Sequence, residues 1–413
     1  MVSKYILKKR VLFLLIALFL PILVLADDGN KIVDKLVSMG FENVCFGEND
    51  KERVYVIENV AYRIEGVGIG KAIDLIQAEG LPKGKKCSLI VLNNNVPTLS
   101  LTYNGDEDGV VDRNNWNVSY NLNDSWEVVK KEKRKNSSLY KVDLTLYPEF
   151  NFQNVKLSVM YEVLFNITPT IETSLWRGGK LSAQLVIPII NQYGYKYDNV
   201  RPGIVSISQT FRLPANIFVT GTVGTFSGNR FGADVKVLYP LKNERLWFDG
   251  RISYTSHAEW GEWKGEKLVT AFKLMDYGES IFTGSVGFNY FVPKFQTQLG
   301  IHFERYLLGE YGVKFDFVRN FKYCVIGFYL SKTQYAGNKG FNGGFKFLIN
   351  LPPYKYKRNG YIPRVIPAKQ WGIIYNAGNE FIYGKWFKVS PSENFATDLK
   401  FNPYIIKHEL LNF

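Results

Sequence analysis

Histidine and cysteine are scarce in this chain of 413 residues, which contains three of each. None of the histidines (His257, His302 and His408) has a second His or Cys at metal-ligand spacing, and no Gly-x-Ser-x-Gly nucleophile elbow occurs. Glu304 and Asp316 could form an acid/base pair, but opposed charges that neutralise one another in a polar interior explain them better. We therefore expect no catalytic residue, no cofactor, no metal site and no enzymatic activity.

Long apolar stretches are absent after residue 26, where no segment approaches the ~18–20 apolar residues of a membrane-spanning helix. Residues 1–26 have the pattern of a signal peptide. Four basic residues among the first ten precede an apolar region from Val11 to Leu25, and Ala26 provides a small residue before Asp27. We expect cleavage after Ala26, with an uncleaved membrane anchor as the alternative. A mature chain that enters a membrane would have to do so with β-strands.

Acidic residues are outnumbered by basic ones, and aromatic residues are abundant. The formal net charge is +13, and loss of the four basic residues of the signal peptide would leave +9. The excess of Lys and Arg could attract lipid phosphates or an anionic polymer, although solvated loops would also account for it. The 64 aromatic residues (8 Trp, 26 Tyr and 30 Phe) and 36 Gly are typical of a β-barrel with aromatic girdles at both membrane interfaces.

Two of the three cysteines lie in the N-terminal part of the chain. In an exported protein Cys45 and Cys87 could form a disulfide. Both also occur in apolar strand-like runs in which a free thiol packs well, so the residues leave the two alternatives open. Cys324 alternates with Ile326 and Phe328 on an apolar face, and we expect it to be inert.

The clearest structural signal is the alternation of apolar and polar side chains between Phe295 and Phe317. It is interrupted at Leu308-Gly309-Glu310, which predicts two strands joined by a short turn. The same pattern recurs many times, with no helices between the repeats to cover an apolar face. The simplest structure is a sheet closed on itself, with lipid outside and water inside.

Strands of this kind follow one another through residues 139–413, and about 12 to 16 of them fit at roughly 10 residues per strand. Apart from the hairpin above, the predicted strands are Tyr140–Phe152, Val155–Asn166, Thr168–Trp176, Leu181–Asn191, Gly203–Leu213, Asn216–Phe226, Phe231–Tyr239, Leu246–Tyr254, Phe282–Tyr290, Lys322–Lys332, Phe345–Leu351 and Trp371–Asn376. The prolines of Leu351–Pro367 exclude a central strand and favour a long loop or an infolded segment. A final strand ending in Phe413 would carry the signal that barrel-assembly machinery recognises.

Residues 27–103 have a different pattern. Apolar residues recur at helical spacing before Gly40 and again between about Gly68 and Ala78. Each helix is followed by two strand-like runs, namely Asn43–Phe46, Arg53–Ile57, Ser88–Leu92 and Thr98–Tyr103. The order α-β-β-α-β-β predicts a small two-layer α/β periplasmic domain. Residues 104–138 are interpreted as a polar linker that could include one strand, Asn115–Leu122, and that ends in the basic run Lys130–Lys135.

The fold class expected is therefore mainly β, a transmembrane antiparallel β-barrel preceded by a small α/β domain. Polar side chains on the inward faces of its strands are candidate contacts for a hydroxyl-rich polymer. The candidate lumen residues are Trp247, Asp249, Arg251, Gln296, Gln298, His302, Glu304, Lys314, Asp316 and Tyr329. Trp247 and Tyr329 could stack on sugar rings, although each could equally fill the lumen.

Five segments of residues 139–413 are similar to the YjbH-like exopolysaccharide biosynthesis proteins, in the Bacteroidetes-type branch. The segments are Leu164–Ile189, Arg201–Pro214, Arg230–Leu241, Phe303–Phe317 and Gly343–Val365. The N-terminal unit also resembles a module found in that family. The resemblance implies an outer-membrane β-barrel encoded with surface-polysaccharide assembly machinery, and it supplies no catalytic residues.

The function expected from this resemblance is export or surface assembly of exopolysaccharide or capsule. The barrel would lie in the bacterial outer membrane, with the N-terminal domain in the periplasm. Expected partners are outer-membrane lipid, polysaccharide, other envelope polysaccharide-assembly proteins and, through Phe413, the barrel-assembly machinery; no nucleic acid is expected. The alternatives are a general diffusion porin and a plugged barrel that acts as a surface scaffold or adhesin, with Leu351–Pro367 as the plug.

Overall fold

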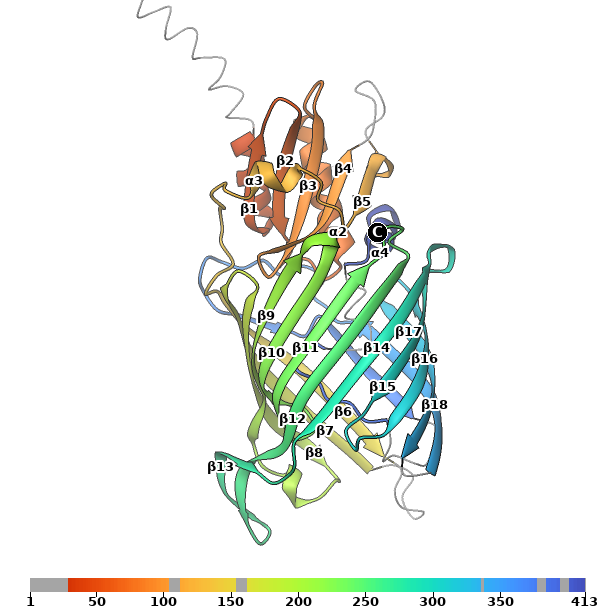
Figure 1. The fold of residues 1–413 in the computed structure, drawn as a ribbon. Coiled ribbons are helices and arrows are strands. Elements are labelled where there is room, and N and C mark those ends of the chain that lie inside the picture. Colours follow the sequence, from red (N-terminus) through yellow and green to blue (C-terminus); the bar gives the residue numbers. More distant parts are fainter. Residues whose placement is uncertain are drawn as a thin grey trace, which may run out of the picture.

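The computed structural model describes residues 29–103, 112–153, 162–335, 338–376, 384–393 and 401–412. A small N-terminal unit of helices and strands sits on one rim of a large curled sheet (Figure 1). Among these residues, no helix is both long enough and apolar enough to cross a membrane.

The N-terminal unit is a five-stranded sheet with helices on both faces. Its elements are a helix over residues 29–39, β1 (Glu42–Glu48), β2 (Glu52–Glu58), α2 (Glu65–Glu79), β3 (Lys86–Asn93), β4 (Val96–Tyr103), β5 (Trp116–Ser119) and α3 (Ser125–Val129). The strand order follows the sequence; the β2–β3 pair is parallel, and the other three pairs are antiparallel. Helix 29–39 and α2 pack on one face of the sheet, and α3 packs on the other.

The first two helices and the first four strands lie at the predicted positions, and the strand that the predicted linker could include, Asn115–Leu122, is present as β5. The rest of residues 112–138 is not a linker, because it contains the helix α3. Within residues 112–138, β5 extends the sheet beside β4 and α3 covers its second face. Each end of the basic run forms an ion pair, since Lys130 contacts Glu127 of α3 and Lys135 contacts Asp34 of helix 29–39. The apolar residues of this polar segment are few, but they are buried: Trp116, Val118 and Tyr120 join one core of the unit, and Leu122 and Val129 join the other.

The two N-terminal cysteines are free and buried, so of the two alternatives left open by the sequence the structure has the packed free thiols. Cys45 lies on β1 and Cys87 on β3, with β2 between them. Their side chains also belong to the separate cores on opposite faces of the sheet. A disulfide would require the two side chains to point toward each other across neighbouring backbones. Burial raises the pKa of the Cys45 thiol to about 11 and that of Cys87 to about 12.

These raised pKa values predict slow labelling of both thiols in the folded protein. Because the thiolate is the reactive form, labelling of Cys45 and Cys87 should stay slow from neutral pH up to about pH 9 and become fast once the chain is unfolded in denaturant. Mass spectrometry after pulsed alkylation measures each site separately. Recovery of a Cys45–Cys87 cross-linked peptide from non-reduced native protein would contradict this assignment.

In the part of the chain that the structure describes, the large sheet contains fifteen strands. They are β6 (Val142–Gln153), β7 (Glu162–Trp176), β8 (Gly179–Asn191), β9 (Arg201–Leu213), β10 (Ile217–Phe226), β11 (Arg230–Pro240), β12 (Leu246–Lys264), β13 (Lys267–Asp276), β14 (Ile281–Val292), β15 (Thr297–Arg305), β16 (Tyr311–Asn320), β17 (Cys324–Tyr335), β18 (Asn338–Asn350), β19 (Arg364–Pro367) and β20 (Gln370–Asn376). Short 3-10 turns occur at Arg113–Asn115, Tyr195–Tyr197, Pro214–Asn216 and Pro293–Phe295.

Consecutive strands from β6 to β18 pair antiparallel in sequence order, with β13 branching off β12 as a hairpin that projects beyond the rim opposite the N-terminal unit (Figure 1). The predicted hairpin is confirmed as β15 and β16, with Phe303 opposite Val313 and His302 opposite Lys314. The segments Val155–Asn166 and Thr168–Trp176, predicted as two strands, contribute from Glu162 onward to the single strand β7. Residues 154–161 lie outside the described part.

One short segment near the C-terminus bonds to both ends of this series of strands. β19 pairs parallel with β6, and β20, which follows after two residues, pairs antiparallel with β18. The rings of Phe152 at the end of β6 and Tyr375 at the end of β20 stack with centroids 5.9 Å apart. The first and the last strands of the series therefore lie next to each other, which explains why the sheet curls in Figure 1.

The proline-rich segment Leu351–Pro367 runs along the rim under the N-terminal unit and is not an internal plug. Its backbone pairs with that of residues 61–63: Tyr356 N donates to Ala61 O, and Arg63 N donates to Tyr354 O. The Arg63 guanidinium donates to Pro353 O and Pro367 O, both at 2.8 Å. The last four residues of the segment form β19. This segment therefore fastens the N-terminal unit to the sheet.

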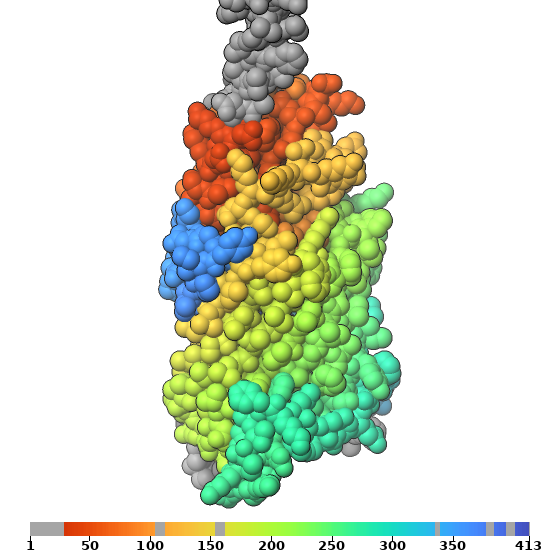
Figure 2. Space-filling view, turned by 90° about the vertical axis from the view of Figure 1, so that its left-hand side faces the viewer, coloured from red at the N-terminus to blue at the C-terminus, as the bar shows by residue number. Residues whose placement is uncertain are grey.

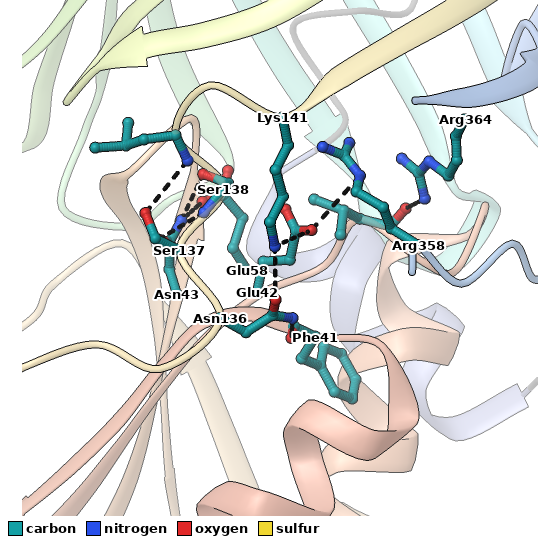
Figure 3. A network of polar contacts seen from close by, with 12 residues as sticks. Phe41, Glu42, Asn43, Glu58, Asn136, Ser137, Ser138, Lys141, Arg358 and Arg364 are labelled. Carbon is teal, nitrogen blue, oxygen red and sulfur yellow. Dashed lines mark hydrogen bonds and ion pairs between the residues drawn. The ribbon is translucent and has the colours of Figure 1, made fainter. Parts of the chain in front are cut away.

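A buried network of charges joins the two parts of the molecule (Figure 3). Lys141, just before β6, contacts Glu42 of β1 at 3.0 Å, and Arg358 contacts the same carboxylate at 3.6 Å. Arg358 and Arg364 both bind Asp143 of β6 at 2.7 Å. Because these groups come from β1, β6 and the Leu351–Pro367 segment, the network fixes all three relative to one another.

The C-terminal residues form a helix, so the predicted final strand is wrong. Helix α4 (Pro403–Asn412) packs on α2, where Gly66 and Gly70 leave room for Glu409 and Leu410. Glu409 Oε2 accepts a hydrogen bond from Gly66 N at 2.8 Å. Lys407 Nζ donates to backbone oxygens of residues 113, 114 and 116. Phe413 lies outside the described residues.

We predict that Arg364→Met loosens the joint between the two parts. The guanidinium binds both oxygens of Asp143 and the carbonyls of Val60 and Tyr356. Removing one partner of a buried ion pair costs about 3 kcal/mol. The urea midpoint of the purified chain should fall, and protease should release the N-terminal unit at lower urea. Lys83→Met, which removes an exposed cation from the same unit, is the control and should change neither quantity. Equal midpoints for the two variants would contradict the proposed role.

Candidate functional site

The large sheet has its polarity reversed relative to a water-soluble protein. Along β15 the apolar Leu299 and Phe303 point outward, with Phe303 59% exposed, whereas Glu304 on the other face is 7% exposed. Other strands repeat the arrangement. The buried polar residues of the sheet include Thr168, Thr170, Asp234, Ser253, Thr255, Thr283, Asn289, Asp316 and Lys346. Burying a polar group costs free energy unless the group is hydrogen-bonded. The polar side chains of the interior therefore need hydrogen-bond or ion-pair partners within the protein.

A first interior cluster surrounds His302 on β15. Its Nε2 lies 3.3 Å from Asp249 on β12, and its Nδ1 lies 3.4 Å from Asp316 on β16. Asp316 also contacts Lys314 at 3.4 Å and forms an ion pair with Lys346 on β18. Two carboxylates and two ammonium groups therefore balance around one imidazole.

Two residues of β14 shape this cluster. A Cβ on Gly287 would lie 2.3 Å from the His302 ring and 2.5 Å from Asp249 Oδ1, so only glycine leaves room for their contact. Asn289 donates to Asp249 and accepts from Gln298 Nε2 at 2.7 Å. The tight packing gives His302 a fixed orientation.

A second cluster holds residues 384–393 against the inside of the sheet. Glu393 contacts Lys236 on β11 at 2.5 Å and Arg251 on β12 at 3.4 Å. Arg251 also binds Asp234 at 2.5 Å, and its guanidinium carbon lies 4.8 Å from the ring centroid of Trp386. The chain's own acidic and aromatic side chains thus occupy the cationic part of the interior.

The same segment contacts several other strands and the turns at the rim far from the N-terminal unit. Trp386 Nε1 donates to Glu304 Oε2 at 2.8 Å, and Phe387 stacks on Phe226 with centroids 5.4 Å apart. Gly384 N donates to Glu310 in the β15–β16 turn at 2.8 Å. At the β10–β11 turn, Ser227 N donates to Lys388 O at 3.0 Å, and Lys388 N donates to Ser227 Oγ at 2.7 Å. These contacts place an ordered plug, defined as residues 384–393, inside the curled sheet.

Most of the predicted lumen residues lie on the buried polar face. His302, Asp249, Lys314, Asp316 and Gln298 belong to the first cluster, and Arg251 and Glu304 contact the plug, as described above. Gln296 is an exception, because it adopts a left-handed backbone conformation (φ 49°) in the turn before β15 and donates to Pro293 O. The prediction that it lines the lumen is wrong, since the turn breaks the alternation one residue before the strand begins.

The two predicted stacking platforms have covered rings. Trp247 is 4% exposed and packs with Phe291 of β14 and Ile405 of α4. The ammonium groups of Lys314 and Lys346 lie 6.0 Å and 5.6 Å from the Tyr329 ring centroid. Both rings therefore fill the interior in this structure.

Several residues of the two interior clusters were not among the predicted lumen residues, and Lys346, Trp386 and Glu393 are three of them. Lys346 could have been found, since it alternates with Phe345 and Phe347 in a predicted strand. Trp386 and Glu393 could not, because they lie in an irregular segment with no periodicity to indicate which way a side chain points.

Comparisons with known proteins add little to this geometry. No family model matches the chain, and no curated protein matches it. Among solved structures, it is similar to "OmpTdeltaL8 (loop L8 deletion mutant of OmpT), an outer membrane protein of Vibrio cholerae". The TM-score is 0.29 and the identity 8%, and the match covers 51% of this chain and 89% of that chain. A likeness at this level carries no argument about function.

We predict a non-additive effect when the central ion pair of the first cluster is dismantled. Asp316→Asn should destabilise the protein by about 3 kcal/mol, because Lys346 loses its carboxylate partner in a buried site. Adding Lys346→Met should recover part of that loss, since the remaining cation is removed. Urea midpoints of the purified variants measure the cycle, and Asp276→Asn at an exposed position is the control. Strictly additive losses would contradict the coupling.

Proposed function

We propose that this chain is an outer-membrane β-barrel that takes part in export or surface assembly of an exopolysaccharide. The observation that carries the membrane part is the reversed polarity of the fifteen-stranded sheet. Large exposed apolar side chains recur on nearly every strand, for example Phe211, Ile252, Phe282, Phe303 and Phe328. In water such a surface would promote association, whereas in a bilayer it is the expected outer face of a barrel.

Closure of the sheet is the second part of this proposal. Lipid offers no partner to unpaired backbone groups, so a membrane sheet needs both edges satisfied. Residues 364–376 bond to β6 through β19 and to β18 through β20. We infer that this segment closes the barrel, with the N-terminal unit in the periplasm.

The polysaccharide part rests on the resemblance to the YjbH-like exopolysaccharide biosynthesis proteins and on the chemistry of the interior. Amide, hydroxyl and paired charged groups suit contact with hydroxyl-rich polymers. The partners proposed are therefore polysaccharide, outer-membrane lipid and other envelope proteins of polysaccharide assembly. On this account the plug leaves the interior during export.

A second candidate is a permanently plugged barrel that acts as a surface scaffold. The contacts of residues 384–393 with several strands of the wall favour it. A general diffusion porin is disfavoured by the same contacts, because the plug and the N-terminal unit occupy the path that a small solute would take.

Deletion of the protein in its host tests the proposal directly. We expect surface-bound and released polysaccharide to fall and to return when the intact chain is supplied. Unchanged polymer in both fractions, under conditions in which the wild type makes it, would leave the scaffold account in place.

Complementation with a locked plug separates export from scaffolding. In a Cys324→Ser background, Ser227→Cys with Lys388→Cys would tie the plug to the wall, because the two backbones already hydrogen-bond at 3.0 Å. We expect the oxidised form to fail in export and the reduced form to succeed. Ser253→Cys with Thr283→Cys joins two directly opposed wall residues and is the matched control. Normal export through the locked form would show that the plug stays in place.

A further inference from the structure

A positive cluster lies at the rim below the N-terminal unit. Arg134 follows α3, and Arg177 lies at the tip of the β7–β8 turn. Their guanidinium carbons lie 5.7 Å and 5.3 Å from the centroid of the same ring, that of Trp126 in α3. The exposed Lys131 and Lys133 are neighbours in sequence. We call these five residues the rim cluster.

The rim cluster has an excess of positive charge: it holds four cations, and the exposed Glu132 is the acidic residue within the same run of sequence. The other long cations of this region have acidic partners, since Lys130 pairs with Glu127, Lys135 with Asp34 and Lys180 with Glu172. Arg134 and Arg177 form no ion pair among the described residues. Burial and the neighbouring charge of Arg134 lower the pKa of Arg177, as expected for two cations held together without an anion.

The position of the cluster relates it to the apolar outer face. On β7 and β9 the outward side chains Ile171, Ile207 and Phe211 are exposed, and this apolar surface ends at the β7–β8 turn. Trp176, immediately before Arg177, is 48% exposed. An exposed indole followed by cations is the arrangement found where a membrane protein leaves the hydrocarbon region and meets the head groups.

The rim cluster lies on the surface between the two parts of the molecule. In Figure 2 the gold segment that contains α3 and the basic run lies between the red strands of the N-terminal unit and the yellow-green strands of the large sheet. Arg177, Lys131 and Lys133 are exposed, whereas Trp126 and Arg134 are half-buried. The cluster therefore combines a fixed aromatic base with cations that can still bind an anion.

We propose that the rim cluster binds the phosphate of a phospholipid head group in the periplasmic leaflet, with Arg134 and Arg177 as its two principal donors. This inference rests on the proposed membrane placement and adds a lipid-binding site to it. Two guanidinium groups supply the planar donors that suit phosphate oxygens. The bound lipid would fix the height of the rim, and hence of the N-terminal unit, relative to the membrane surface.

The test uses the full-length protein in a non-ionic detergent and a short-chain phosphatidylglycerol. Isothermal titration gives the affinity, and native mass spectrometry gives the number of lipids retained. At about fivefold per cation, Arg177→Gln should weaken binding about fivefold and Arg134→Gln with Arg177→Gln about 30-fold. The control pair, Lys267→Gln with Lys273→Gln, removes two exposed charges from β13 at the opposite end and should bind as the wild type does.

Other outcomes would overturn the proposal. Equal lipid affinity in the double variant and the wild type would show that Arg134 and Arg177 do not bind the lipid. An equal loss of affinity in the β13 control would show that the effect depends on the net charge of the protein and not on these two residues. Inorganic phosphate binding as tightly as the lipid would indicate a free-phosphate site. Preference for a soluble polyuronate over the lipid would assign the cluster to an acidic polymer.

The lipid measurement is independent of polysaccharide export. Loss of lipid binding in the double variant, together with an unchanged polymer phenotype in the deletion strain, would support the site and reject the export function. Because Arg177 is exposed, its single variant should fold normally, and an unchanged urea midpoint shows that a loss of binding is local.

Discussion

The reversed polarity of the large sheet is the constraint on which the rest of the molecule depends. Successive side chains of a strand point to opposite faces, so the same register that exposes Phe303 and Phe315 also brings His302 and Lys314 inside. A slip of one residue between two strands would expose charges and bury rings. Register is therefore fixed from both faces.

Charges inside the sheet are balanced across several strands. Asp316 on β16 is surrounded by His302, Lys314 and Lys346 from three strands, and Asp234 on β11 is bound by Arg251 from β12. Such networks are stable when every member is satisfied and costly when one is lost. The plug completes the second network, because Glu393 supplies the acid that Lys236 and Arg251 share. Residues that follow the last strand of the sheet therefore complete the charge pairing of the interior.

The N-terminal unit is joined to the sheet in a similar way, by residues from distant parts of the chain. Glu42 of β1 meets Lys141 and Arg358, and Asp143 of β6 meets Arg358 and Arg364. On the other side, α4 packs on α2 and binds the β5 region. The two parts are therefore connected through buried polar contacts and a packed helix.

The sequence by itself determined the strand series, the hairpin at residues 295–317, the first helices and strands of the N-terminal unit and the inward side of Asp249, Arg251, His302, Glu304, Lys314 and Asp316. These follow from periodicities of two and 3.6 residues, which are local properties of the chain. Only the tertiary structure decided that Cys45 and Cys87 lie on opposite faces of a sheet, that residues 403–412 form a helix, and that residues 384–393 fill the interior. These features depend on contacts between segments far apart in sequence, and no local pattern encodes which distant surface a segment will meet.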